Sequence, residues 1–400
     1  MTAIVERVLA VRQWSLRQLI GSVDLARAAE LGEKLVADAA RILGPEQPDT
    51  LATRMDLARA YEATGQLDAA IAGYQAVISD YQRTLGEDHG DTLAARDNLA
   101  GALESAGRVE EAIAAYEAVL AERHHILGAD HADTMNSRNN LADALESAGR
   151  VEEAIAGYGV VLAQRLRILG ADHPDTLISR NNLASAHDTA GHLGEAITQF
   201  EAVLGDQQRV LGSDHPDTLA TRNNVAYVYE SAERFDEAVA LYEDVLADRV
   251  RVLGADHPDT LITRNNLAFA YRSVGRLPEA IAAHDALLED RLRILGPLHP
   301  DTLTSRNNVA IAYESAGRVD EAIAILEALV PVRAQVLGED HPHTLRTRNN
   351  VANAYRSAGR TTEAVASFRA VLADAEHALG TNHPLAVEIR ENLAAAERNA

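Results

Sequence analysis

A histidine recurs every 42 residues along the chain, usually with an aspartate before it and another two residues after it. The fullest form of this segment is Asp-His-Pro-Asp, as at 172–175 and 256–259. Imidazole and carboxylate groups this close together could bind a metal ion. Each segment supplies only one imidazole, however, so we expect hydrogen bonds to the following helix and no metal site. The histidines of this column are His89, His131, His173, His215, His257, His299, His341 and His383.

No other arrangement of reactive side chains points to catalysis. The sequence has no cysteine, no glycine-rich phosphate loop and no nucleophile paired with a base outside the repeated pattern. We therefore expect neither an enzyme nor a cofactor. A repeated serine beside a predicted turn is better explained by turn hydrogen bonds than by six nucleophiles; it occurs as Ser105, Ser147, Ser231, Ser273, Ser315 and Ser357.

These residues recur because the chain is one 42-residue unit copied eight times. The pair Leu-Gly begins each copy, at 43, 85, 127, 169, 211, 253, 295 and 337, and occurs once more at 379. A fixed period of this length is typical of arrays in which each helix pair packs on the next. The sequence predicts eight repeats over 43–378, a degenerate helical cap over 1–42 and a capping helix over 379–400.

Each copy predicts two helices joined by a short turn, and copy five serves as the example. The residues at 216–218 are typical of a helix start, with the Asp217 carboxylate accepting backbone N–H groups. A turn follows at 231–234, where the other seven copies have glycine in place of Glu233. The second helix is predicted over 235–253. Its buried side is expected to include Ala238, Val239, Tyr242, Val245, Leu246 and Val252.

The spacing within each copy resembles the signature of the tetratricopeptide repeat. In copy five, Arg222-x2-Val225-Ala226-x2-Tyr229 and then Ala238-x3-Tyr242 match Trp-x2-Leu-Gly-x2-Tyr followed by Ala-x3-Phe. The period, the segment Asn-Asn-Leu-Ala and the segment Leu-Gly-x-Asp-His-Pro are similar to those of the kinesin light chain subclass. The resemblance implies an all-α fold, a right-handed superhelical α-solenoid of antiparallel helix pairs, with a concave groove that binds peptide segments of partners.

One position departs from the tetratricopeptide signature, because every copy has arginine where tryptophan or another apolar residue is usual. Arg222, for example, shares the packing stripe of its helix with Leu219 and Val225. A charge in that place must be paired. We expect a carboxylate or a helix-end carbonyl of a neighbouring loop as the partner, with ligand contact as the alternative. The column runs Arg54, Arg96, Arg138, Arg180, Arg222, Arg264, Arg306, Arg348 and Arg390.

The resemblance also implies which positions of the first helix line the groove. One of them holds the first asparagine of an Asn-Asn pair in six copies. An amide both donates and accepts hydrogen bonds, so a ladder of amides could pair with an extended peptide backbone. Alternatively, these asparagines, or their neighbours one residue later, bond between adjacent repeats. The column comprises Asn139, Asn181, Asn223, Asn265, Asn307 and Asn349.

Two further columns would line the same groove. An acidic column includes Glu230 and is reversed in charge at Arg272 and Arg356. The most variable column places large apolar residues in three consecutive copies, at Tyr227, Phe269 and Ile311. Buried aromatic anchors carry most of the energy of peptide binding, so these three form a candidate hot-spot strip. The alternative is that they pack sideways against the next repeat.

The charge of the chain limits the kind of partner. Asp and Glu number 60 against 37 Lys and Arg, which gives a formal net charge of −23. This charge disfavours nucleic acid and anionic membranes and favours a neutral to basic protein or peptide with an apolar anchor. No apolar run approaches the roughly 18 residues of a membrane span. Together with the absence of cysteine, this predicts a cytoplasmic protein.

A self-assembling structural scaffold is the alternative function. Association could use the solenoid ends or the cap at 1–42, and would make the chain a homo-oligomer. That cap contains Trp14, Leu16, Leu19 and Ile20, which form either a packed cap or a dimer contact.

Overall fold

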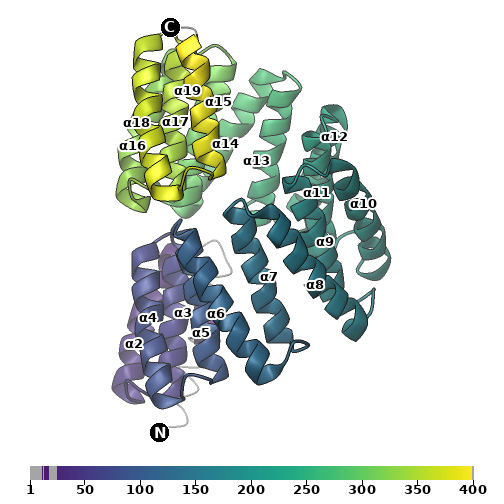
Figure 1. Cartoon of the computed structure of the whole chain (residues 1–400), viewed down its shortest axis with the longest axis vertical. Helices are drawn as coiled ribbons and strands as arrows, with labels where there is room; N and C mark the ends of the chain where they lie inside the picture. The colour runs from purple at the N-terminus through teal and green to yellow at the C-terminus, as the bar shows by residue number, and fades with distance from the viewer. Residues whose placement is uncertain (1–10, 12, 18–24, 399–400) are drawn as a thin grey trace. The chain divides into compact units, whose positions relative to one another are not determined.

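A computed structural model describes residues 11, 13–17 and 25–398 (Figure 1). Within these ranges every regular element is a helix, which confirms the all-α prediction. The helices are α2 (Leu25–Ile42), α3 (Pro48–Ala63), α4 (Leu67–Thr84), α5 (Gly90–Ser105), α6 (Val109–Leu127), α7 (Ala132–Ser147), α8 (Val151–Leu169), α9 (Pro174–Thr189), α10 (Leu193–Val210), α11 (Pro216–Ser231), α12 (Phe235–Val252), α13 (Pro258–Ser273), α14 (Leu277–Leu295), α15 (Pro300–Ser315), α16 (Val319–Leu337), α17 (Pro342–Ser357), α18 (Thr361–Leu379) and α19 (Pro384–Arg398).

The helices alternate between two kinds, as the period predicts. Odd-numbered helices from α3 to α17 are the first helices of copies one to eight, and even-numbered helices from α4 to α18 are the second helices. The chain forms two compact units, residues 1–186 and residues 187–400. Within each unit, helices that follow one another in the chain pack side by side, as α16, α17, α18 and α19 do in Figure 1. Each unit is therefore a stack of helix pairs.

The repeated histidine caps the first helix of copies two to eight, whereas copy one has Gln47 there and no side-chain cap. In copy five, His215 Nδ1 accepts a hydrogen bond from the Asp217 N–H at 3.2 Å. Pro216 occupies the first helical position, where its missing N–H costs nothing. The predicted hydrogen bond between loop and helix is confirmed, but the assignment of Asp217 as the capping acceptor is wrong. The side chain that caps the helix lies two residues earlier.

The turn after the first helix uses the left-handed backbone conformation. Glycine supplies it in most copies, and Glu233 adopts the same conformation with φ of 59°. A side chain there is strained, because Cβ crowds the backbone when φ is positive. Glu233 therefore costs stability that the glycine copies do not lose.

The core of copy five follows the predicted stripes. Leu219, Val225 and Tyr242 are almost completely buried. The exception is Val252 in the last turn of α12, which is 37% exposed. Its predicted burial is therefore wrong.

In five copies the repeated arginine of the first helix pairs with a carboxylate on the second helix of the same copy. Arg222 on α11 contacts Asp248 on α12 at 2.6 Å, and Arg264 contacts Asp290 at 2.7 Å. The partner is a carboxylate, as expected, but it lies 26 residues later on the second helix of the same copy, so the predicted place in a neighbouring loop is wrong for these arginines. Arg390 is different, since it donates to the Thr381 carbonyl in the preceding loop. The pairs tie the two helices of a copy together.

The N-terminal cap combines a buried and an exposed apolar residue. Leu16 is buried with residues of α2 and α3, whereas Trp14 is 62% exposed. Arg17 pairs with Asp56 of α3 at 2.9 Å. Leu19 and Ile20 lie outside the described residues. Among the described helices, none combines the length and the apolar character needed to cross a bilayer.

Candidate functional site

Three consecutive first helices place a large apolar side chain in the same column. Tyr227 lies on α11, Phe269 on α13 and Ile311 on α15, all within the second unit. We call these three residues the apolar strip. Tyr227 is 53% exposed, and Phe269 and Ile311 are half-buried. The strip thus retains apolar surface that neighbouring repeats do not cover.

Phe269 is held by residues of its own copy. Its ring meets His284 of α14 edge-on, with the ring centroids 5.1 Å apart. On another side, the Arg272 guanidinium carbon lies 5.4 Å from the Phe269 centroid. An arginine over an aromatic face is attracted by the ring quadrupole. The orientation of Phe269 is therefore set before any ligand binds.

Arg272 changes the polar pattern beside the strip. In other copies the corresponding acid accepts a hydrogen bond from a serine of the next repeat, as Glu230 does from Ser273 at 3.2 Å and Glu314 from Ser357 at 2.6 Å. Arg272 cannot accept, and Ser315 donates instead to the Ile311 carbonyl. Copy six thus interrupts a ladder that otherwise joins successive repeats.

Burial affects the charge of the acids in this ladder. It raises the pKa of the Glu230 carboxyl, while the Ser273 hydrogen bond and the Arg272 charge oppose the rise. In the first unit, burial likewise raises the pKa of Glu104, and it raises the pKa of Asp143, which stands at the position of Tyr227 in copy three, to about 6. Burial therefore disfavours the charged form of these carboxylates.

The asparagine column forms a second ladder. The amide of the second asparagine in one copy donates to the carbonyl oxygen of the first asparagine in the preceding copy. This bond joins Asn182 to Asn139 at 3.0 Å, Asn308 to Asn265 at 2.9 Å, Asn350 to Asn307 at 2.9 Å and Asn392 to Asn349 at 3.3 Å.

Burial then decides which asparagines can reach a ligand. Asn223, Asn307 and Asn349 are at most 6% exposed, so their amides cannot line an open groove. These three asparagines form hydrogen bonds between repeats, which is the alternative that the sequence left open. Asn139, Asn181 and Asn265 are half-buried and keep some exposed surface.

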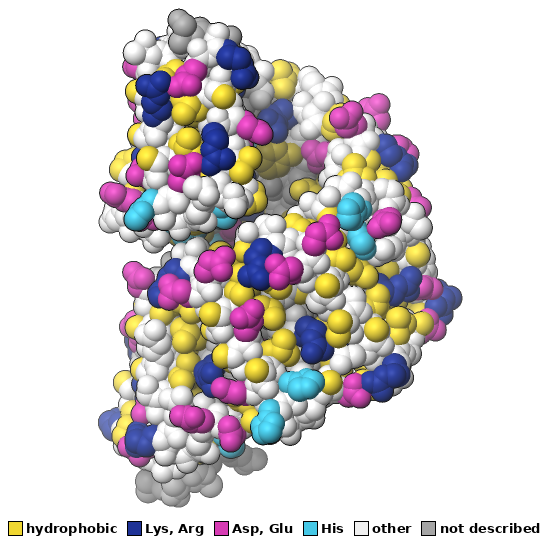
Figure 2. Space-filling view, in the orientation of Figure 1, with side chains coloured by type: hydrophobic (Ala, Val, Ile, Leu, Met, Phe, Trp, Pro, Cys, Tyr) yellow, Lys and Arg dark blue, Asp and Glu magenta, His cyan; other side chains and the backbone are white. Residues whose placement is uncertain are grey.

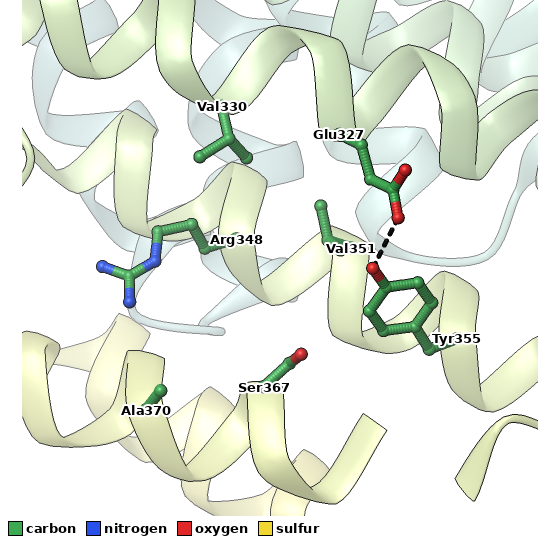
Figure 3. A pocket seen from close by; sticks show the side chains of 7 residues that line it. All are labelled: Glu327, Val330, Arg348, Val351, Tyr355, Ser367 and Ala370. Carbon is green, nitrogen blue, oxygen red and sulfur yellow. Dashed lines mark hydrogen bonds between the residues drawn. The ribbon is translucent and has the colours of Figure 1, made fainter. Parts of the chain in front are cut away.

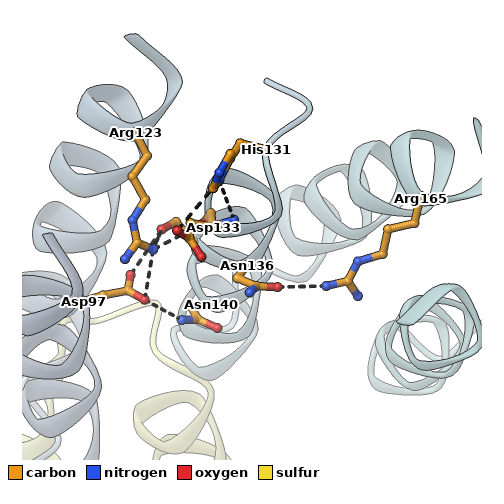
Figure 4. Close-up of polar contacts among 8 residues, drawn as sticks. Asp97, Arg123, His131, Asp133, Asn136, Asn140 and Arg165 are labelled. Atoms are coloured by element: carbon orange, nitrogen blue, oxygen red, sulfur yellow. Dashed lines mark hydrogen bonds and ion pairs between the residues drawn. The ribbon is translucent and has the colours of Figure 1, made fainter. Parts of the chain in front are cut away.

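A buried arginine column on the second helices was not predicted. Arg123, for example, donates to the Asp133 carbonyl and the Ser137 hydroxyl of the next first helix, and Arg165 donates to Asn136 (Figure 4). The column was visible in the sequence as an arginine repeated at the same place, but its burial was not. Each of its arginines joins its own copy to the next one. The column comprises Arg123, Arg165, Arg249, Arg291 and Arg333.

The described hollows lie away from the apolar strip. One, of about 330 Å³, is lined by Val330 of α16, by Arg348, Val351 and Tyr355 of α17, and by Ser367 and Ala370 of α18, with Glu327 accepting the Tyr355 hydroxyl (Figure 3). A second, of about 280 Å³, is lined by α14, α15 and α16 and includes Arg306. Arg306 has no carboxylate opposite it, because copy seven has Val332 at the partner position. Both hollows lie between consecutive second helices.

Two family models of the tetratricopeptide repeat match the sequence. One matches residues 55–121, 92–158, 133–205, 259–335 and 315–376, and the other matches residues 218–259. Together they cover most of the chain and confirm the resemblance. No curated protein matches the sequence.

Solved structures of helical repeat proteins are similar to the chain. A kinesin light chain-like protein of Podosopora anserina with nearly identical TPR-like repeats is 32% identical, over 50% of this chain and 95% of that one, with a TM-score of 0.45. A Rap protein complexed with competence and sporulation factor is 13% identical, over 98% of this chain and 99% of that one, with a TM-score of 0.58. The apo form of the quorum sensor NprR from B. thuringiensis is 14% identical, over 92% and 99%, with a TM-score of 0.54. The last two share the fold.

Proposed function

This chain belongs to the tetratricopeptide repeat family, and on that premise we propose that it is a non-catalytic scaffold that binds a peptide segment of a partner protein. The binding surface is the exposed face of the first helices in copies five to seven. The Rap protein of similar fold was solved with competence and sporulation factor bound, which supports a binding role for this architecture.

The apolar strip is the observation that carries this proposal. Tyr227, Phe269 and Ile311 occupy one column on α11, α13 and α15. Many side chains of the polar columns beside them form hydrogen bonds between repeats. The apolar strip is therefore the surface that we propose for a ligand. A peptide laid across it would bury an apolar anchor next to Phe269, whose ring is already held in place.

The charge of the protein determines which charge the bound peptide should carry outside its apolar anchor. The chain has a formal net charge of −23, and on the face shown in Figure 2 basic side chains stand among acidic ones. A neutral to basic segment would be attracted to this surface. Arg272 provides a local positive charge for a backbone carbonyl or a carboxylate next to the anchor. Asn265 and Glu230, which lie in the same unit as the strip, are proposed as secondary contacts.

A peptide-display selection against the full chain tests the proposal. Peptides that are enriched would be synthesised and titrated against the wild type and against a variant with Tyr227→Ala, Phe269→Ala and Ile311→Ala. We expect apolar residues in the selected peptides and at least about 100-fold weaker binding by the variant, because each anchor contributes more than about 1 kcal/mol.

A matched control separates this site from general hydrophobic adhesion. Val160, Leu166 and Ile168 on α8 are exposed apolar residues of the first unit. Their replacement by alanine removes a comparable apolar surface and should leave the affinity within about twofold. Equal losses in the two triple variants would contradict the proposed site.

Self-association is the second candidate, and the exposure of Trp14 favours it. Leu16 anchors the N-terminal segment while Trp14 remains at the surface, where a second copy could cover it. Light scattering over a range of concentrations tests this function. A mass that rises with concentration in the wild type but not in Trp14→Ser supports it, and a monomer at every concentration contradicts it.

A further inference from the structure

Three side chains at the turn between α9 and α10 bring metal-ligating atoms together. His187 lies in the last turn of α9, His192 precedes α10, and Glu195 lies in the first turn of α10. His187 Nδ1 lies 3.4 Å from His192 Nδ1 and 3.3 Å from Glu195 Oε2. One ligating atom from each of the three lies within 4.8 Å of the other two, and no other such group occurs in the part of the chain that the structure describes.

The same positions in copies five to eight hold a different set, with identical spacing. In copy five, the Arg234 guanidinium carbon lies 3.8 Å from the Tyr229 ring centroid. Arg234 also donates two hydrogen bonds to Glu237, at 2.6 and 2.7 Å. Tyrosine, arginine and glutamate therefore form a stacked ion pair that closes the turn.

Copy four keeps the glutamate and replaces both of its neighbours by histidine. His187 stands at the tyrosine position, His192 at the arginine position and Glu195 at the glutamate position. The two replacements remove an aromatic ring and a permanent cation and introduce two imidazoles beside a carboxylate. Two imidazoles and one carboxylate are a ligand set that zinc uses in proteins.

Two of the three distances between the ligand atoms are compatible with a tetrahedral metal ion. Ligand atoms about 2.0–2.1 Å from zinc lie about 3.3–3.4 Å apart across a tetrahedral edge. The two measured contacts have this length. Hydrogen bonds from nitrogen are usually about 2.7–3.2 Å long. The imidazole planes are also tilted by 43°, so the rings approach through their nitrogens and do not stack.

We propose that His187, His192 and Glu195 form a binding site for one divalent transition-metal ion, with Zn²⁺ as the best-fitting ion. The His187 side chain is only 14% exposed, which fixes one ligand, while Glu195 at 66% exposure can adjust to the ion. Three protein ligands leave a fourth position for water. The bound ion would join the end of α9 to the start of α10, in place of the ion pair that other copies use.

The test measures Zn²⁺ binding to tag-free, chelator-treated full-length chain by titration calorimetry. We expect saturation at one Zn²⁺ per chain in the wild type. The variant with His187→Tyr and His192→Arg recreates the residues of copy five, so it should fold normally. Its affinity for Zn²⁺ should fall by more than about 100-fold, since even losing a supporting residue outside the ligand set costs about 10–100-fold.

A control variant and a second readout complete the test. His124 and His125 are adjacent exposed histidines on α6, and their replacement by glutamine should leave Zn²⁺ binding unchanged. Zn²⁺ should also raise the melting temperature of the wild type and not that of the His187→Tyr, His192→Arg variant, because a ligand of the native state stabilises it. Absence of saturable binding in the wild type, or equal binding by that variant, would overturn the proposal.

Discussion

Phe269 meets His284 edge-on within copy six, with ring centroids 5.1 Å apart and ring planes at 78°. His284 is 1% exposed, and neither of its ring nitrogens has a hydrogen-bond partner. Burial, together with the charges of Arg272 and Arg291, lowers the pKa of His284 to about 4. The neutral imidazole therefore acts as an aromatic support beneath Phe269, at the cost of two unsatisfied polar atoms.

Replacement of His284 by phenylalanine should stabilise the protein and remove part of its acid sensitivity. Copies four and eight have Phe200 and Phe368 at this position. The unfolded chain binds a proton near pH 6.5, whereas the folded protein resists protonation of His284 down to about pH 4. As the pH decreases from 6.5 to 4, the free energy of unfolding of the wild type therefore decreases by up to about 3 kcal/mol because of His284.

Urea unfolding at several pH values measures this effect. His284→Phe should be more stable than the wild type at pH 7.5 by about 1 kcal/mol, and the difference should grow as the pH falls toward 4. A difference that does not change with pH would refute the role given to His284.

Glu233→Gly should raise stability by about 1 kcal/mol, because glycine adopts the left-handed conformation at this turn without the Cβ clash. Glu233 has a φ of 59°, and the turn glycines of the other copies also have positive φ. Thermal unfolding checks the expectation. Glu233→Ala is the control, since it removes the charge but keeps the Cβ atom, and it should gain little.

Asp143→Asn should stabilise the first unit at neutral pH. Burial raises the pKa of Asp143 to about 6, above its unfolded value of 3.8, so the folded state loses stability as the pH rises through this window. A carboxamide oxygen can still accept the Tyr158 hydroxyl, but the carboxamide nitrogen cannot replace the oxygen that accepts from Asn139 at 3.0 Å, which reduces the gain. The gain should be about 1–2 kcal/mol at pH 7.5 and should vanish near pH 4. A constant gain at both values would mean that protonation of Asp143 is not the cause.

Arg249→Ala should be strongly destabilising, whereas Arg249→Gln should not. Arg249 is 3% exposed and donates to the Asp259 carbonyl and the Thr263 hydroxyl of the next repeat. Alanine leaves a cavity and unpaired acceptors, which costs about 2–4 kcal/mol. Glutamine stands at this position in copy four, as Gln207, and fills most of the space. Equal losses in chemical unfolding would show that glutamine cannot take over the contribution of Arg249.

The helices could be predicted from the sequence because the 42-residue period and the apolar stripes repeat without a break. The wrong predictions concern single residues, where the period does not decide which of two nearby side chains has the role. The cap was assigned to Asp217 because carboxylates are common caps, yet the imidazole of His215 accepts the N–H. Val252 continues the apolar stripe in sequence, but more than a third of its surface stays exposed.

The candidate site was less predictable, because the relative rotation of stacked repeats is not encoded in any single copy. The two asparagine columns are one residue apart, and only the stacking shows that Asn307 is buried between repeats. The convergence of His187 and His192 could have been found by comparing the turns of the eight copies. The expectation of no metal site considered only the loop histidines, and neither of these belongs to that column.

The most direct test of the central claim is a fluorescence titration of a display-selected peptide against the wild type and Phe269→Ala. Phe269 is the middle residue of the apolar strip, and its removal should weaken binding by at least about tenfold while the melting temperature stays close to that of the wild type. An unchanged affinity would contradict a binding surface on the first helices of copies five to seven.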